Sequence, residues 1–207
     1  MLLLNVYQII FFVALALVVI ALAFIFVFLP LRRKYIKKKF DEHYYKTIRR
    51  IVDNEDYYLI NKFIYKIDDA HVGTIDHILF GDKYFYIITS KYYEGDLKGN
   101  MNDKSLVLYN RSGQKFYVNN PYTEVKRLLE SLSLNTDVDS KLMIGIVVVN
   151  KGVNIHVESQ SKQYYAIQIN KLPQLIKAIE SREIPTINET QLAKAVKVFD
   201  KLNRRRD

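Results

Sequence analysis

The sequence predicts an α/β protein with a mixed central sheet flanked by helices, preceded by a single transmembrane helix. The first observation is an unbroken apolar run from Ile9 to Leu29 near the start of the chain. The second is the order of patterns after it, in which a helix, several strands with hairpin connections and a second helix precede another apolar run at residues 142–149. A run of that kind is typical of a central strand covered on both faces. The chain has no cysteine, which excludes disulfide bonds and thiolate metal sites.

The first apolar run is long enough to cross a membrane as a helix. At about 1.5 Å per residue, the stretch from Ile9 to Leu29 spans a hydrocarbon core of about 30 Å. No charged residue precedes the run, whereas Pro30 and a basic block follow it. The positive-inside rule therefore places the N-terminus outside the cell membrane and the globular part in the cytoplasm. A cleaved signal peptide, with Ala21 and Ala23 as its small residues, is the alternative, but it would begin with positive charge and have a shorter apolar stretch.

A basic block follows the apolar run, and the formal net charge of the chain is +9. The block consists of Arg32, Arg33, Lys34, Lys37, Lys38 and Lys39. We expect it to flank the membrane as an anchor, and its charge also suits contact with anionic lipid headgroups or nucleic acid. The predicted segments are a transmembrane helix at 1–31, a basic juxtamembrane segment at 32–39, a globular domain at 40–182, and a C-terminal helix with a basic tail at 183–207.

Periodicity predicts the elements of the globular part. Residues 40–52 repeat apolar side chains at three- and four-residue steps, which is the period of an amphipathic helix. Aromatic and β-branched runs predict strands at 57–67, 74–80, 84–91, 105–110 and 114–118, with turns at 68–73 and 81–83 and with Gly95 and Gly99 in a loop. Further helices are predicted at 122–134, 172–179 and 188–202, and further strands at 142–149, 153–157 and 164–169.

One predicted hairpin carries residues that suit metal-dependent chemistry. Asp76 lies in its first strand, and Thr89 and Lys91 lie in its second. Because side chains alternate along a strand, Thr89 and Lys91 share a face, and a turn at 81–83 lets Asp76 face the same side. Metal-dependent nucleases place carboxylates that hold Mg²⁺ beside a lysine that stabilises charge or helps to activate water. The structural alternative is an aspartate satisfied within the sheet and an ion pair between it and the lysine.

The stretch IDHILFGDKYFYIITSKYYEGDLKG, at residues 75–99, resembles the central motif of the nuclease-related domain (NERD) family. The family's Asp-His pair is matched by Asp76 and His77, the lysine of its Glu-x-Lys by Lys91, and its glycine-bearing loop by Gly95 and Gly99. This family is placed in the restriction-endonuclease-like superfamily, whose motif is written PD-(D/E)xK. The resemblance therefore implies a restriction-endonuclease-like fold and a nuclease-type metal site.

Residues farther along the chain support the same resemblance, which covers residues 40–179. Asn120 and Pro121, followed by a predicted helix, resemble the family's Asn-Pro segment. Glu124 stands where the family commonly has a glutamine. The apolar run at 142–149 resembles the family's next buried strand.

The sequence departs from the family at one metal ligand. The glutamate of Glu-x-Lys is expected at position 89, where this chain has Thr89. A neutral hydroxyl is a poor replacement for a carboxylate on a hard divalent cation. The resemblance implies Asp76 as a metal ligand, together with an acidic residue of the first helix of the domain, Asp41 or Glu42. The catalytic positions it implies are Asp76, Lys91 and the degenerate Thr89.

These observations support three hypotheses for function. The first is a membrane-anchored, NERD-like protein with a degenerate metal site and a binding or scaffolding role at the cytoplasmic face. The second is an active nuclease on DNA or RNA, which would require Mg²⁺. The third is a structural membrane-associated protein that binds anionic lipid or a protein partner. His77 should face away from the site and be packed rather than catalytic, and the scattered His43, His71 and His156 predict no zinc site.

Overall fold

The computed structural model describes residues 6–66, 72–158 and 161–204. The chain divides into two compact units, Met1–His43 and Tyr44–Asp207, and the boundary between them falls within helix α2 (Leu29–Glu55). The described part of the first unit is helical, and all the described strands belong to the second unit.

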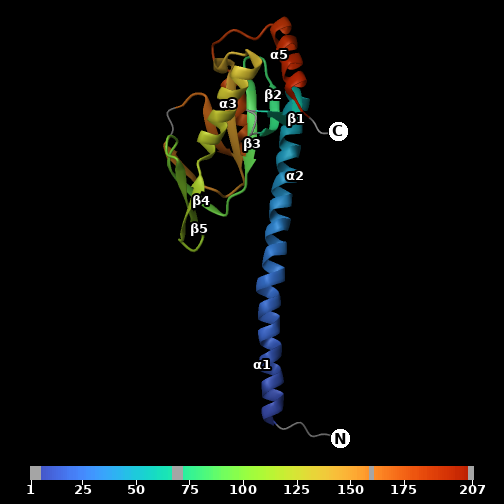
Figure 1. The fold of residues 1–207 in the computed structure, drawn as a ribbon, viewed down its shortest axis with the longest axis vertical. Helices are drawn as coiled ribbons and strands as arrows, with labels where there is room; N and C mark the ends of the chain where they lie inside the picture. Colours follow the sequence, from blue (N-terminus) through green and yellow to red (C-terminus); the bar gives the residue numbers. More distant parts are fainter. Residues whose placement is uncertain (1–5, 67–71, 159–160, 205–207) are drawn as a thin grey trace. The chain divides into compact units, whose positions relative to one another are not determined.

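The first unit consists of α1 (Val6–Ala23), a π-helical turn η1 (Phe24–Phe28) and the beginning of α2 (Figure 1). At the end of the π-helical turn, the N–H of Leu29 donates to the carbonyl of Phe24. Pro30 follows directly, and a proline has no N–H and collides with the carbonyl four residues back in a regular α-helix. The wider π turn accommodates this residue, so the helix continues through it.

One helix near the N-terminus, from Gln8 to Glu55, is long and apolar enough to cross a membrane, as judged by length and composition. The helix predicted to begin near Phe40 begins earlier, because α2 already starts at Leu29. The basic block lies on this helix, and all its side chains are exposed. Lysine and arginine are good helix formers, so nothing in the block interrupts the helix.

The second unit contains a five-stranded mixed sheet in the order β1-β2-β3-β7-β9. Its strands are β1 (Tyr58–Lys66), β2 (Val72–Phe80), β3 (Phe85–Lys91), β7 (Met143–Val149) and β9 (Tyr164–Gln168). The first three are antiparallel neighbours, whereas β3, β7 and β9 run parallel. Every residue of β7 is buried, which confirms the predicted central strand. The predicted hairpin β2–β3 is also confirmed; of the turn predicted at 68–73, residues 68–71 lie outside the described residues.

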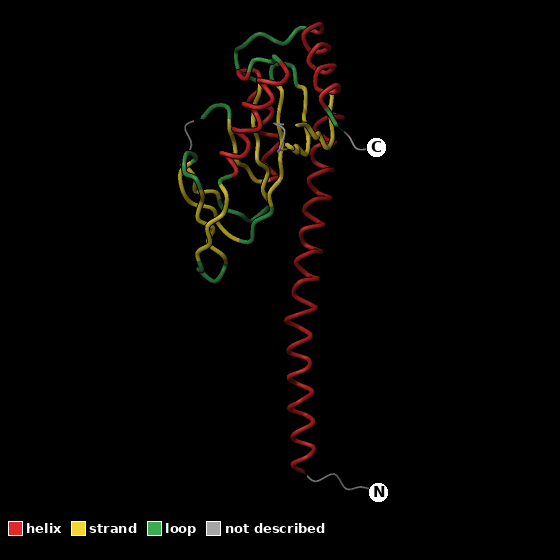
Figure 2. Tube along the Cα trace, in the orientation of Figure 1, coloured by secondary structure: helices red, strands yellow, loops and turns green. Residues whose placement is uncertain are grey.

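A second sheet of four strands, which the sequence analysis did not anticipate, has the order β6-β5-β4-β8 (Figures 1 and 2). Its strands are β4 (Gly95–Asn100), β5 (Ser105–Asn110), β6 (Lys115–Asn119) and β8 (Ile155–Glu158). The loop predicted around Gly95 and Gly99 is wrong, because both glycines lie in β4. Gly95 allows β5 to approach closely, since an added Cβ would collide with the carbonyl oxygen of Tyr109.

Three helices lie at the positions that periodicity predicted. They are α3 (Pro121–Thr136), α4 (Leu172–Glu180) and α5 (Glu189–Leu202), with short 3₁₀ turns η2 (Ser140–Leu142) and η3 (Ile169–Lys171) between them. Helix α3 packs on β7 and β9, and α5 contacts β1 and α3. The structure therefore confirms the mixed α/β fold class, with helices packed on sheets.

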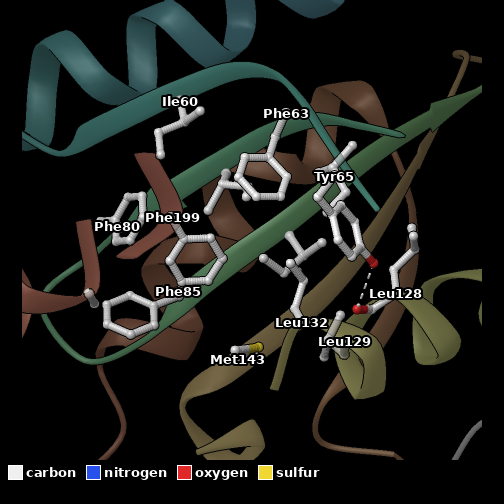
Figure 3. Close-up of a cluster of buried hydrophobic side chains, with 14 residues drawn as sticks. Ile60, Phe63, Tyr65, Phe80, Phe85, Leu128, Leu129, Leu132, Met143 and Phe199 are labelled. Atoms are coloured by element: carbon white, nitrogen blue, oxygen red, sulfur yellow. Dashed lines mark hydrogen bonds between the residues drawn. The ribbon is translucent and has the colours of Figure 1, made fainter. Parts of the chain in front are cut away.

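An aromatic cluster joins α5 to the five-stranded sheet (Figure 3). The ring of Phe199 on α5 lies 5.8 Å from that of Phe63, 5.5 Å from that of Phe80 and 6.5 Å from that of Phe85, measured between centroids. Buried leucines of α3 complete the cluster, as Figure 3 shows for Leu128, Leu129 and Leu132. Aromatic pairs at such distances contribute about 1 kcal/mol each beyond their burial.

Candidate functional site

Asp76 lies at a point where the pairing of β2 with both neighbouring strands is interrupted. On the β1 side, Asn61 pairs with His77 and Phe63 pairs with Ile75. Lys62 and Asp76, which lie between these pairs, are not paired in the ladder. The backbone of Lys62 is left-handed, with φ of 53°. On the other side, pairing with β3 ends at His77↔Ile88. Counted away from the hairpin turn, Asp76 is therefore the first residue of β2 that is no longer paired with β3.

The interruption resets the alternation of side chains along β2. Ile75 and Ile78 both belong to the main hydrophobic cluster, although residues three apart in a regular strand face opposite sides. Ile60 and Phe63 of β1 show the same spacing and belong to the same cluster. Lys62, whose backbone is left-handed, lies between Ile60 and Phe63, and it returns the Phe63 side chain to the face of the sheet that Ile60 occupies. Strict alternation, on which the sequence analysis relied, does not hold across Asp76.

The carboxylate of Asp76 bridges the separated strands β2 and β3. Its Oδ2 accepts a hydrogen bond from the backbone N–H of Ser90, at 2.7 Å, and another from the Ser90 hydroxyl, at 2.8 Å. Both side chains are half-buried. Hydrogen bonds to an ionised acceptor are among the stronger ones in proteins. Asp76 is thus satisfied within the sheet, as the structural alternative expected, although its partner is Ser90.

Thr89 and Lys91 flank Ser90 on β3. Thr89 is buried, with 8% of its surface exposed, and pairs with Val147 of β7. The ammonium of Lys91 lies 2.8 Å from each carboxylate oxygen of Glu124, in the first turn of α3. The side chains of Lys91 and Glu124 are 35% and 46% exposed, so water screens this pair. The ion pair of Lys91 is therefore made with α3, where the sequence analysis considered one with Asp76.

His77 is buried beneath two tyrosines of α2. The ring centroids of Tyr44 and Tyr45 each lie 5.0 Å from that of His77. Nδ1 of His77 lies 2.7 Å from Oδ1 of Asn61, which makes Nδ1 the donor, and Nε2 has no hydrogen-bond partner among the described residues. Burial lowers the pKa of His77 to about 4, although Asp76 acts to raise it. The imidazole is therefore neutral at pH 7, and its complete burial confirms the prediction that this side chain is packed.

Asn120 connects the beginning of α3 to the β4–β5 loop. Its Oδ1 accepts from the N–H of Tyr122 and caps the helix, while its Nδ2 donates to the carbonyls of Asn100, Met101 and Asp103, at 3.3, 3.0 and 2.7 Å. The side chain is 2% exposed. The Asn-Pro segment thereby fixes the helix turn that carries Glu124.

The comparisons with known proteins bear on this hairpin and helix. The family model described as "Nuclease-related domain", NERD, matches residues 37–150, more than half of the chain. The chain belongs to the NERD family. The matched region contains Asp76, Thr89, Lys91 and Glu124, whereas α4 and α5 lie after it.

Beyond the NERD family model, the similarities are remote. A solved structure titled "Crystal Structure of Protein of Unknown Function AF1548" shares 11% sequence identity and gives a TM-score of 0.31, covering 77% of this chain and 96% of that chain. A likeness of this size carries no functional information. The comparison with curated proteins gives no match.

In the part of the chain that the structure describes, no three histidine, aspartate or glutamate side chains form a group that could hold a metal ion. On α2, within the first unit, Asp41 is half-buried and Glu42 is exposed. Two pairs were not predicted from the sequence: Ser90 with Asp76, and Glu124 with Lys91. Neither pair has a local sequence signal, because each depends on where the strands separate and where α3 packs.

Proposed function

We propose that this NERD protein is anchored in the cell membrane by α1 and carries a degenerate nuclease-type metal site. Its globular unit then acts at the cytoplasmic face as a binding or scaffolding module, with nucleic acid as its expected ligand, rather than as an enzyme that cuts it. The observation that carries the proposal is the buried Thr89, which directly precedes Asp76's partner Ser90 on β3, at the position where a carboxylate is expected.

The charges of the hairpin support the proposal. Asp76 supplies one carboxylate, one oxygen of which already accepts two hydrogen bonds. Thr89 supplies no charge, and the nearest carboxylate to Lys91, that of Glu124, is bound to its ammonium. Divalent cations such as Mg²⁺ favour several charged oxygen ligands. Among these residues, Asp76 supplies the one carboxylate that is not paired with a lysine. Mg²⁺ is therefore expected as a cofactor only if the protein proves to be an active nuclease.

The anchoring half of the proposal is supported by the apolar helix and the exposed basic block that follows it on α2. Basic residues just beyond a transmembrane helix mark the cytoplasmic side and attract anionic lipid headgroups, at about 1 kcal/mol per residue near the surface. The absence of cysteine makes a direct test simple. In intact cells, an impermeant maleimide should label Asn5→Cys at once and Ser112→Cys only after permeabilisation. The opposite pattern would invert the orientation.

The nuclease half is tested with plasmid DNA and RNA, Mg²⁺ or Mn²⁺, and the full chain in detergent. We expect no cleavage by the parent. Thr89→Glu restores the missing charge, and Thr89→Gln is its matched control because it has the same size and no charge. Cutting by Thr89→Glu alone supports a site that lacks one ligand. Cutting by the parent that is lost in Asp76→Ala overturns the proposal of a degenerate site.

A second candidate is an active nuclease, and one observation favours it. Glu124 brings a carboxylate to within 2.8 Å of Lys91, at the end of the strand that lacks the family's glutamate. In that case Glu124→Gln should abolish cleavage by the parent. In a protein with a degenerate site the same substitution has no activity to remove.

A further inference from the structure

The four-stranded sheet has one covered face and one uncovered face. Its inner face is apolar: Leu97 and Leu106 are buried in a second hydrophobic cluster, with Leu108 and Val118 packed against it. Because side chains alternate, the residues between these ones point away from that cluster. Figure 1 shows this sheet, around β4 and β5, beside the five-stranded sheet of the same unit.

Two cross-strand rows make up the uncovered face. The registers align Tyr117, Val107, Lys98 and His156 in one row, across β6, β5, β4 and β8. They align Lys115, Tyr109 and Asp96 in the adjacent row. Directly paired residues in a sheet lie on the same face, and diagonal neighbours lie within reach of aromatic and long side chains. Tyr109 and Tyr117 are such diagonal neighbours.

This face carries exposed aromatic surface and two lysines beside an aromatic ring. Tyr117 is 80% exposed, which is unusual for a large ring. The ammonium groups of Lys98 and Lys115 lie 4.9 and 5.6 Å from the centroid of the Tyr109 ring. Both lysines are exposed, so each can contact a further ligand from its position beside a ring.

We propose that this face, centred on Tyr117 and Tyr109, is a platform for single-stranded nucleic acid. Bases would stack on the tyrosine rings while Lys98 and Lys115 contact the phosphates, which is the combination that binds single strands without sequence preference. The proposal rests on the proposed function, since it names the form of nucleic acid and the surface that binds it. A duplex offers no free base faces, so the platform does not serve duplex DNA.

The acidic residues of this face belong to β4 and β8, and β5 and β6 carry none. Asp96 accepts hydrogen bonds from the backbone N–H and the side-chain amide of Asn154, which lower its pKa, so its charge is held at the β4 end. Glu158 lies at the far end of β8, opposite Asn100. The half of the face formed by β5 and β6 therefore carries the rings together with Lys115, and Lys98 lies beside it.

The test uses the full chain in detergent micelles and fluorescence anisotropy. The probes are a labelled single-stranded DNA and RNA of about 16 nucleotides and a duplex of equal length. Tyr117→Ala should weaken single-strand binding about fivefold or more, because stacking on an aromatic contributes at least about 1 kcal/mol per base. Tyr117→Phe keeps the ring and should bind like the parent. Leu134→Ala, which removes a side chain that is 84% exposed on α3, is the matched surface control and should also bind like the parent.

A salt titration tests the lysines. Replacing Lys98 and Lys115 by glutamine should reduce the slope of log affinity against log salt by about 1.4, at about 0.7 per phosphate contact. An unchanged slope overturns their assignment to phosphates.

The outcomes separate this proposal from the proposed function. If the parent binds single strands and Tyr117→Ala binds them equally well, the platform is wrong and nucleic-acid binding stands. If the parent binds neither single strands nor duplex, both proposals fall. If Tyr117→Ala instead halves the mass of the assembly in gel filtration and leaves oligonucleotide binding unchanged, a second copy of the chain covers this face and the platform is overturned.

Discussion

The carboxylate of Asp76 accepts two hydrogen bonds from a single residue, Ser90, whose backbone N–H and hydroxyl lie 2.7 and 2.8 Å from Oδ2. This pair holds β2 to β3 beyond the end of their ladder. Ser90→Ala removes the hydroxyl and should lower the free energy of unfolding by about 1–2 kcal/mol, since the acceptor is charged and half-buried. Thermal unfolding of the full chain, followed by tyrosine circular dichroism, measures the change.

A matched control for this prediction is Ser112→Ala. The Ser112 hydroxyl donates at 2.7 Å to Asn110, but in an exposed hairpin, where water can replace the bond. We expect a change within about 0.5 kcal/mol. An equal loss of unfolding free energy in the two variants would show that the bond from Ser90 to Asp76 stabilises the protein no more than an exposed bond does.

His77 should make stability depend on pH. Its pKa is lowered by burial to about 4 from an ordinary 6.5, so between these values the unfolded chain binds more protons than the folded one. The free energy of unfolding should be unaffected above pH 6.5 and fall as the pH drops from 6.5 toward 4, by at most about 3 kcal/mol. Denaturant titrations across this range measure the slope.

Two variants isolate the contribution of His77. His77→Gln has no imidazole to titrate and should lose most of the slope between pH 4 and 6.5, whatever its stability at pH 7. His156→Gln removes an exposed imidazole and should keep the parental slope. A parental slope in His77→Gln would assign the effect to other groups.

Substitution of Asn120 should lower the stability of the protein more than substitution of most other polar residues. Asn120→Ala removes a helix cap and leaves three carbonyls of the β4–β5 loop without their donor, so we expect a loss of about 2–4 kcal/mol. Asn120→Ser keeps an oxygen for the cap and lacks the amide donor. It should recover about 1 kcal/mol of that loss. Identical losses in the two variants would mean that the cap contributes nothing.

Gly145 determines how closely α3 approaches β7. An added Cβ would lie 2.7 Å from a methyl carbon of Val125 and 3.2 Å from one of Leu129. Gly145→Ala should therefore cost about 1–3 kcal/mol through overpacking. Adding Val125→Ala makes room, so the double variant should be more stable than the sum of the single changes predicts. Simple additivity in a thermal-unfolding cycle would contradict the close approach.

Much of the fold could be predicted because local patterns and tertiary packing agree. The buried run of β7, the hairpin β2–β3 and the helix that begins after Asn120 each follow from a pattern within a few residues. The second sheet could not be predicted in the same way. Gly95 and Gly99 are typical of loops, and only the close approach of β5 explains why β4 contains them.

The placement of the candidate residues on one hairpin could be predicted, but their hydrogen bonds and ion pairs could not. Asp76, Thr89 and Lys91 do lie at the end of the hairpin, on β2 and β3. Their partners depend on two non-local features: the break in pairing opposite Lys62 and the packing of α3, which carries Glu124. Neither feature leaves a periodic signal, because alternation assumes that a strand stays regular along its whole length.

The aromatic cluster also bears on how this chain folds as it is synthesised. Strands β1 to β3 emerge from the ribosome early, at a rate of about 5–20 residues per second. Phe199 is translated much later than these strands, and its ring completes the packing of Phe63, Phe80 and Phe85. During that interval their rings remain partly exposed to solvent or to chaperones. Closure by so distant a segment favours slow folding, after most of the polypeptide has left the tunnel.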